Sequence, residues 1–224
     1  MTETQDVPIR DAATIILVRD VETAPAILMG QRGKTAAFMP DKFVFPGGAV
    51  DRSDAEIDLN GSLGTSNASR LKAEATGPSP ETLAAAAIRE LWEETGQCLG
   101  KPGDWTNAPE DWKGFANHGL CPDASALHFF FRALTPPGRP RRLDARFFLA
   151  DAKALATDPD DFSEATEELS HLHWVPLGDV RKLNLPFITR VVLGELNAHL
   201  PRTDAPDRVP FVKNDQIDSK VIWL

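Results

Sequence analysis

The segment SPETLAAAAIRELWEETG, residues 79–96, predicts one amphipathic helix. Ser79 suits the N-cap position, the proline that follows suits the first turn, and Gly96 suits the C-terminal stop. Apolar residues recur at steps of three and four, as expected for the packed face of a helix. They are Leu83, Ala84, Ala87, Ile88 and Leu91. We therefore expect one face of this helix to be buried in the core.

The same helix carries three glutamates on a common surface. Glu90, Glu93 and Glu94 stand at positions i, i+3 and i+4, which are neighbours on a helix. Carboxylates that lie close together repel each other, whereas a hard divalent cation such as Mg²⁺ prefers oxygen anions as ligands. A metal site is one interpretation. A solvated acidic face, which most glutamate clusters are, is the other.

Composition indicates one large globular domain. The chain has 224 residues, of which 42% are hydrophobic and 25% are charged. Its net charge of −9 argues against a general nucleic-acid or anionic-membrane binder, since those proteins need a positive surface. A bound cation would still admit a small anionic substrate, because the ion reverses the local field.

The termini and cysteines favour a cytoplasmic protein. The first residues, MTETQDVPIRDA, lack the basic and apolar pattern of a signal peptide, and no apolar run reaches the length that spans a membrane. Cys98 and Cys121 form neither a disulfide framework nor a zinc motif, so we expect two reduced thiols.

Strand and helix patterns alternate along the chain, which predicts α/β or α+β layers. Residues 12–19 and 26–32 are expected to form a hairpin, and a short strand at 43–45 runs into Pro46, Gly47 and Gly48. The other expected strands are 127–134, 143–150 and 173–176, and the other expected helices are 109–118 and 186–200. We expect a polar lead-in at 1–11, a single domain at 12–200, and a tail at 201–224 that packs on the domain.

Residues 52–78 differ in character from their surroundings. They are polar and contain a candidate short helix at 69–75. We interpret them as an insertion on the surface. A loop without function and a substrate lid are both consistent with this sequence.

Gly48, Glu81 and residues 89–96, RELWEETG, resemble the Nudix box, G-x5-E-x7-R-E-U-x-E-E-x-G-U, in which U is a bulky aliphatic residue. From Glu81 to Gly96 the match is residue for residue. The first gap, residues 49–80, is far longer than five residues, and Gln97 replaces the last aliphatic residue. Extra loop length costs little closure entropy. Gln97 follows the metal-binding turn, so it bears on packing more than on chemistry.

The long gap also resembles one branch of this superfamily, the acyl-CoA-diphosphatase-like proteins. The supporting stretches are Gln31-Arg32, Phe38-Met39-Pro40, FVFPGG at 43–48 and PRRLDARFFLA at 140–150. The resemblance covers roughly residues 12–200. It implies an α/β/α sandwich with a mixed β-sheet between helices.

Nudix enzymes hydrolyse a diphosphate linked to another group, using Mg²⁺ or Mn²⁺. The resemblance implies that Glu90, Glu93, Glu94 and the Gly48 carbonyl bind the metal. It also implies that Arg89 holds Glu93, and Glu81 with it, by charge-assisted hydrogen bonds. Trp92 lies off the metal face and is expected to pack.

The general base is left open by the motif, because family members use either a glutamate of the box or one from a later loop. The later candidates are Glu164, Glu167 and Glu168, and we prefer Glu168. The alternative is that this acidic loop is solvated surface. His171 and His173 have no metal-binding spacing and are expected to be ordinary side chains.

Arginines are the candidate phosphate ligands, since guanidinium groups bind phosphate in a bidentate way. Arg32, Arg141, Arg142 and Arg146 are the candidates, and each alone is equally consistent with a surface residue. We prefer the adjacent pair Arg141 and Arg142, because CoA carries an additional 3′-phosphate.

Three functions follow from the resemblance. The first is hydrolysis of CoA or acyl-CoA, and the second is hydrolysis of ADP-ribose or a dinucleotide. The third is a nucleotide-binding module without catalysis, which the intact motif disfavours. The expected partner is a small-molecule diphosphate, with neither nucleic acid nor membrane. Many relatives dimerise, so a homodimer is the assembly suggested by analogy.

Overall fold

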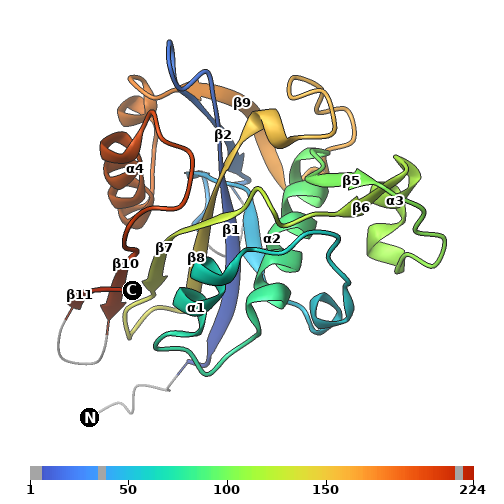
Figure 1. Cartoon of the computed structure of the whole chain (residues 1–224). Coiled ribbons are helices and arrows are strands. Elements are labelled where there is room, and N and C mark those ends of the chain that lie inside the picture. The colour runs from blue at the N-terminus through green and yellow to red at the C-terminus, as the bar shows by residue number, and fades with distance from the viewer. Residues whose placement is uncertain (1–6, 35–38, 215–218) are drawn as a thin grey trace.

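A mixed β-sheet forms the centre of the molecule (Figure 1). The structure is a computed structural model that describes residues 7–34, 39–214 and 219–224. Within these residues, nine strands form one sheet whose main path runs β11-β10-β7-β8-β1-β2-β3, while β4 pairs with β1 and β9 pairs with β2. A separate ribbon consists of β5 and β6.

The strands are β1 (Ile9–Arg19), β2 (Ala26–Arg32), β3 (Phe43–Val44), β4 (Gly47–Ala49), β5 (Gly100–Pro102), β6 (Leu120–Pro122), β7 (His128–Leu134), β8 (Arg142–Asp151), β9 (Leu169–Pro176), β10 (Pro210–Asn214) and β11 (Ser219–Trp223). The helices are α1 (Thr65–Lys72), α2 (Pro80–Thr95), α3 (Lys113–Asn117) and α4 (Phe187–His199). Short 3-10 turns are η1 (Arg52–Glu56), η2 (Glu110–Trp112), η3 (Ala152–Ala154) and η4 (Val180–Lys182).

Strand β1 organises the sheet. It pairs in parallel with β8 from Ile9 opposite Arg142 to Val18 opposite Asp151. It also forms the expected antiparallel hairpin with β2, and it pairs with β4 through Ala13 opposite Gly48. Its run of β-branched and aliphatic residues suits a strand that is buried on both faces.

Helices cover both faces of the sheet, as the predicted α/β/α sandwich requires (Figure 1). Alternate β1 side chains enter two cores: Ile15 and Leu17 pack with helix α2, whereas Ile16 and Val18 pack with helix α4. This alternation follows from the two-residue period of a strand. The predicted mixed sheet between helices is confirmed.

Several elements differ from the prediction at their ends. Strand β1 begins at Ile9, inside the expected lead-in, and residues 1–6 lie outside the described residues, as does Phe38. Strand β9 begins at Leu169, so part of the expected acidic loop is strand. The tail contributes β10, which pairs in parallel with β7, and β11 at the edge of the sheet.

Most side chains of residues 52–78 are not buried, but a few of them anchor this segment in the domain. Ile57, Leu63 and Leu71 lie in the same core as helix α2. Asn67 is buried; its amide nitrogen donates to the Leu63 carbonyl, and its oxygen accepts from the Phe129 N–H. The short helix is present, but it begins at Thr65.

Candidate functional site

Helix α2 positions the acidic side chains as the sequence predicts. The Ser79 hydroxyl accepts the Thr82 N–H at 3.1 Å, and Gly96 ends the helix in the left-handed conformation. Trp92 packs edge-on against Phe115, so its predicted packing role is confirmed.

Strand β4 lies against the acidic end of the helix. The Gly47 N–H donates to Oε2 of Glu94 at 2.8 Å. A Cβ atom placed on Gly48 would stand 2.4 Å from Oε1 of Glu90. Glycine is therefore required at this position, because any side chain would displace the Glu90 carboxylate.

Burial sets the protonation of these carboxyl groups. Burial is the largest cause that raises the pKa of Glu90, to about 7, with the charges of Glu93 and Glu168 adding to it against Arg89. The pKa of Glu94 is raised well above its ordinary value, first by burial and then by the charge of Glu90. Burial also raises the pKa of Glu93. A cation at this surface would offset the cost of holding these groups ionised.

The carboxylates suit a hard divalent cation. Oε1 of Glu94 is buried and has no hydrogen-bond partner among the described residues. Within residues 7–34, 39–214 and 219–224, no three His, Cys, Asp or Glu side chains already stand as a ready-made metal group. Arg89 engages Oε1 of Glu90, and Gly47 engages Oε2 of Glu94. The second oxygen of each carboxylate is therefore the one offered to a ligand, and an all-oxygen donor set fits Mg²⁺ or Mn²⁺.

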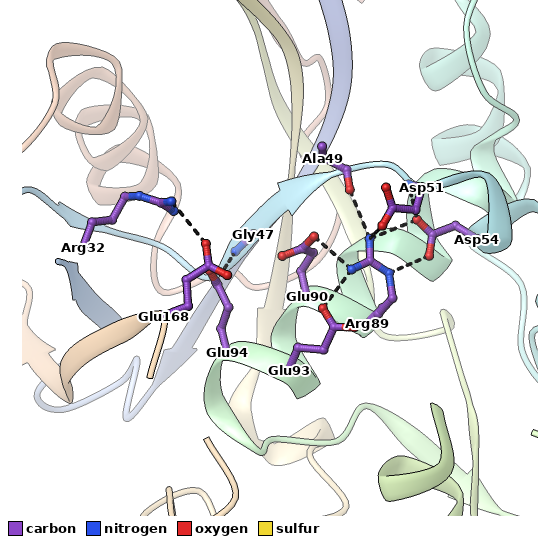
Figure 2. A network of polar contacts seen from close by, with 10 residues as sticks. All are labelled: Arg32, Gly47, Ala49, Asp51, Asp54, Arg89, Glu90, Glu93, Glu94 and Glu168. Carbon is purple, nitrogen blue, oxygen red and sulfur yellow. Dashed lines mark hydrogen bonds and ion pairs between the residues drawn. The ribbon is translucent and has the colours of Figure 1, made fainter. Parts of the chain in front are cut away.

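Arg89 is buried among five partners, which are Asp54, Glu90, Glu93, the Ala49 carbonyl and the more distant Asp51 (Figure 2). Its NH1 donates to Glu90 at 3.0 Å and to Glu93 at 2.9 Å. Its opposite edge donates to Asp54, from Nε at 2.8 Å and from NH2 at 3.1 Å. Burial opposes the charge, but the Asp54 hydrogen bonds and the surrounding carboxylates outweigh it and raise the pKa of Arg89. The two hydrogen bonds to Asp54 thus orient Arg89 so that its NH1 points to Glu90 and Glu93.

Asp54, not Glu81, is the acidic partner of Arg89. Glu81 is exposed in the first turn of helix α2, and it is absent from the contacts of Arg89 among the described residues. Sequence reasoning missed Asp54, although a signal was present: five residues separate Gly48 from Asp54, which is the first gap of the motif. The long gap therefore follows the acidic residue instead of preceding it.

Glu168 lies at the same site, at the start of β9. Its charge raises the pKa values of both Glu90 and Glu94, and its carboxylate accepts from Arg32 NH2 at 3.2 Å (Figure 2). Glu164 lies instead near Gly96 and 3.8 Å from His118, and Glu167 is exposed. The fold thus brings Glu168 and Arg32 to the helix carboxylates.

Gln97 anchors the loop that leads to Glu168. It is completely buried, and its amide nitrogen donates to the carbonyls of Asp158 and Asp161 at 3.1 and 2.6 Å. Its oxygen accepts from the Thr157 hydroxyl at 2.9 Å. The polar residue in place of the motif's aliphatic one is therefore fully hydrogen-bonded.

The other predicted arginines lie elsewhere. Arg142 pairs with Ile9, four residues along β1 from the partner of Gly48, which is about 13 Å at 3.3 Å per residue. It is buried and donates to the Thr135 carbonyl, whereas Arg141 is exposed. Arg146 is buried in ion pairs with Asp11 and Asp144. The preferred pair for a CoA phosphate is thus apart from the carboxylates.

Comparisons with known proteins agree with this geometry. A family model for the NUDIX domain matches residues 8–194. The chain is 31% identical to a Caenorhabditis elegans protein described as putative nudix hydrolase 7, over 74% of this chain and 51% of that protein. It therefore spans about half the length of this curated relative. None of the helices that the structure describes is long and apolar enough to cross a membrane.

Solved structures show the same fold. A NUDIX hydrolase from Alicyclobacillus acidocaldarius superposes with a TM-score of 0.62 and 28% identity, over 86% of this chain and 92% of that one. The NUDIX domain of Shewanella oneidensis NrtR, complexed with ADP ribose, superposes with a TM-score of 0.51 and 13% identity, over 86% and 89%. The family model, the relative and the fold agree, and the chain belongs to the Nudix hydrolase family.

Proposed function

We propose that this chain is a metal-dependent hydrolase that cleaves the diphosphate of a nucleoside diphosphate derivative containing an ADP unit. The observation that carries this proposal is the convergence of Glu90, Glu94 and Glu168 beside the β4 backbone, with one buried Glu94 oxygen that has no partner among the described residues. CoA, acyl-CoA and ADP-ribose all contain the ADP unit, and a dinucleotide is a further member of the class.

Glu90 and Glu94 would hold Mg²⁺ or Mn²⁺, with Glu93 and the Gly48 carbonyl as further ligands. When bound, the ion neutralises the diphosphate and lowers the pKa of a water. Arg89 orients Glu90 and Glu93 through NH1, while Asp54 fixes its other edge. Glu168 would accept the proton of the attacking water, and Arg32 would bind a phosphate oxygen beside it.

CoA and ADP-ribose are supported by different observations. Residues 140–150, with the stretches Gln31-Arg32 and FVFPGG at 43–48, resemble the acyl-CoA-diphosphatase-like branch, which favours CoA. Arg142 lies about 13 Å along β1 from the partner of Gly48, so the pair Arg141 and Arg142 stays the proposed site for the CoA 3′-phosphate, away from the metal ligands. The neighbour from Shewanella oneidensis binds ADP ribose, and its likeness to this chain concerns the fold. ADP-ribose is therefore the second candidate.

A substrate panel with Mg²⁺ or Mn²⁺ tests the proposal. We expect release of AMP or 3′,5′-ADP from at least one of CoA, acetyl-CoA, ADP-ribose and a diadenosine polyphosphate, abolished by EDTA. Much faster turnover of ADP-ribose than of CoA would reject the CoA assignment. No hydrolysis of any compound, together with stabilisation of the fold by one of them, would support a binding module.

A further inference from the structure

We propose that a hollow between strands β2, β3 and β9 binds the base of the substrate and selects a base with an exocyclic amino group, such as adenine. The hollow has a volume of about 590 Å³ and is lined by Gln31, Phe43, His171, Leu172, His173 and Leu183. This inference rests on the proposed function, because it assigns the part of the substrate that the carboxylate cluster does not bind.

The hollow lies on the same two strands as Arg32, on the face of the sheet that packs with helix α4. Arg32 pairs with Leu169, the residue after Glu168, and Gln31 pairs with Ser170. His171 is three residues from Glu168, which is at most about 10 Å along the chain. A nucleotide whose phosphates lie at Arg32 can reach this distance with its base. The volume is also typical of small-molecule sites.

Two aromatic side chains form a corner in the hollow. The rings of Phe43 and His173 meet edge to face, with centroids 6.0 Å apart and planes at 87°. Either ring offers a face on which a planar base can stack. Leu172 and Leu183 supply the apolar walls beside them.

The polar atoms of the hollow are hydrogen-bond acceptors. The Gln31 amide nitrogen donates to the carbonyl and the carboxylate of Asp41, at 3.4 and 2.9 Å. This orientation leaves its amide oxygen as an acceptor, which receives no hydrogen bond from the described part of the chain. Nδ1 of His173 lies 2.7 Å from the His171 carbonyl and must donate to it, so Nε2 of the neutral ring is an acceptor.

The backbone conformation of His171 also supports a ligand site at this hollow. Its φ of 52° lies in the left-handed region, which a non-glycine residue adopts at an energetic cost. Such residues occur often at ligand sites, where the surrounding structure holds them. Two acceptors match the amino group of adenine, whereas the keto oxygen of hypoxanthine would meet them as a third acceptor.

Binding of AMP and IMP tests the inference without turnover, because neither contains a diphosphate. We expect calorimetry with Mg²⁺ to show AMP binding at least tenfold tighter than IMP. His173→Phe keeps a ring but removes the acceptor, so it should reduce this ratio to a few-fold. Phe43→Leu keeps an apolar side chain and should weaken both nucleotides alike. Phe187→Ala is the control, since this ring is 80% exposed and outside the hollow.

Equal affinity for AMP and IMP, or unchanged affinities in folded His173→Phe and Phe43→Leu proteins, would overturn the inference. Thermal melting of each variant establishes that it is folded. If the panel substrates are hydrolysed but AMP and IMP bind alike, the base site fails and the proposed function stands. If AMP selectivity depends on these residues but no panel substrate is hydrolysed, the proposed function fails and the base site stands.

Discussion

At the scale of one residue, a substitution of Glu94 tests its role in the chemistry while leaving its packing unchanged. Glu94→Gln keeps the shape and an acceptor for the Gly47 N–H but removes the negative charge from a buried position. We expect turnover to fall at least about 100-fold, since loss of groups that only support metal ligands already costs 10–100-fold. Steady-state kinetics at saturating Mg²⁺ measure this.

Glu81→Gln is the matched control for Glu94→Gln, because Glu81 is an exposed glutamate of the same helix. Its turnover and thermal stability should equal those of the unchanged protein. A folded Glu94→Gln protein with turnover within twofold of the unchanged protein would contradict the proposed role.

Asp54 should act on the site through Arg89. In Asp54→Asn the buried guanidinium loses one charged partner and keeps Glu90 and Glu93, and breaking a buried pair costs up to about 3–5 kcal/mol. We expect a lower free energy of unfolding and 10–100-fold weaker Mg²⁺ binding. Chemical denaturation and metal titration measure the two effects.

Asp51→Asn provides the comparison for Asp54→Asn. The Asp51 carboxylate is exposed and 3.9 Å from Arg89 NH2, so its loss should change stability by less than about 1 kcal/mol. Equal effects of the two substitutions would show that the hydrogen bonds between Asp54 and Arg89 stabilise the protein no more than the exposed Asp51 does.

The raised pKa of Glu90 predicts that the free energy of unfolding depends on pH. Its folded pKa of about 7 lies above the ordinary value of about 4.3, so the folded state binds the proton more tightly than the unfolded state. This contribution is fully present below about pH 4.3 and is lost as pH rises through 7.

In EDTA, the unchanged protein should therefore lose stability relative to Glu90→Gln between pH 5 and pH 8, and Mg²⁺ should oppose this loss. Urea denaturation of both proteins at each pH measures the difference. A difference that is constant across this range would contradict the raised pKa.

At this scale the sequence predicted the helix carboxylates and the pair of Arg89 with Glu93, but not the contact of Arg89 with Asp54. The glutamates follow from helix periodicity, which is local. Two acidic residues, Asp54 and Glu81, each stand at one of the motif's spacings. Only the fold shows that Asp54 is buried and Glu81 is exposed.

At the scale of elements, Gln97 couples the end of helix α2 to the loop before β9. Gln97→Leu leaves the Asp158 and Asp161 carbonyls and the Thr157 hydroxyl without this partner. We expect a loss of about 1–3 kcal/mol in stability and faster amide exchange in residues 157–168. Hydrogen exchange measured by mass spectrometry localises the change; uniform exchange across the chain would contradict it.

Strong local patterns predicted the elements well, and weak ones did not. The hairpin of β1 and β2 and helices α2 and α4 have clear periodicity. Strands β10 and β11 lie in a polar tail without clear periodicity; β11 is at the edge of the sheet, and β10 lies between β11 and β7. The position of Arg142 relative to helix α2 was not predictable from the sequence, since the register of β8 against β1 is set by residues far apart in the sequence.

At the scale of the molecule, residues 52–78 contribute apolar side chains to the core. Replacing residues 57–77 with a short Gly-Ser linker removes Leu63, Leu71 and the buried Asn67 while keeping Asp54. We expect cooperative thermal unfolding to be lost, because the hydrophobic core then has a large cavity. Differential scanning calorimetry measures this; an unchanged transition would show that the segment is dispensable.

Asn67→Ala is the milder companion of this deletion. It leaves the Phe129 N–H and the Leu63 carbonyl without their partner, which should cost about 1–3 kcal/mol. Exposed Ser66→Ala in the same helix should have little effect.

The parallel pairing of β1 with β8 also has a consequence for how the chain folds. Ile9 meets Arg142 and Val18 meets Asp151, so the central pair joins segments separated by most of the domain. Such distant contacts make folding slow, because loop closure must precede the gain from pairing. During synthesis, β1 cannot pair with β8 until β8 has left the ribosome. In that interval the unpaired side of β1 and its apolar side chains can bind chaperones or aggregate.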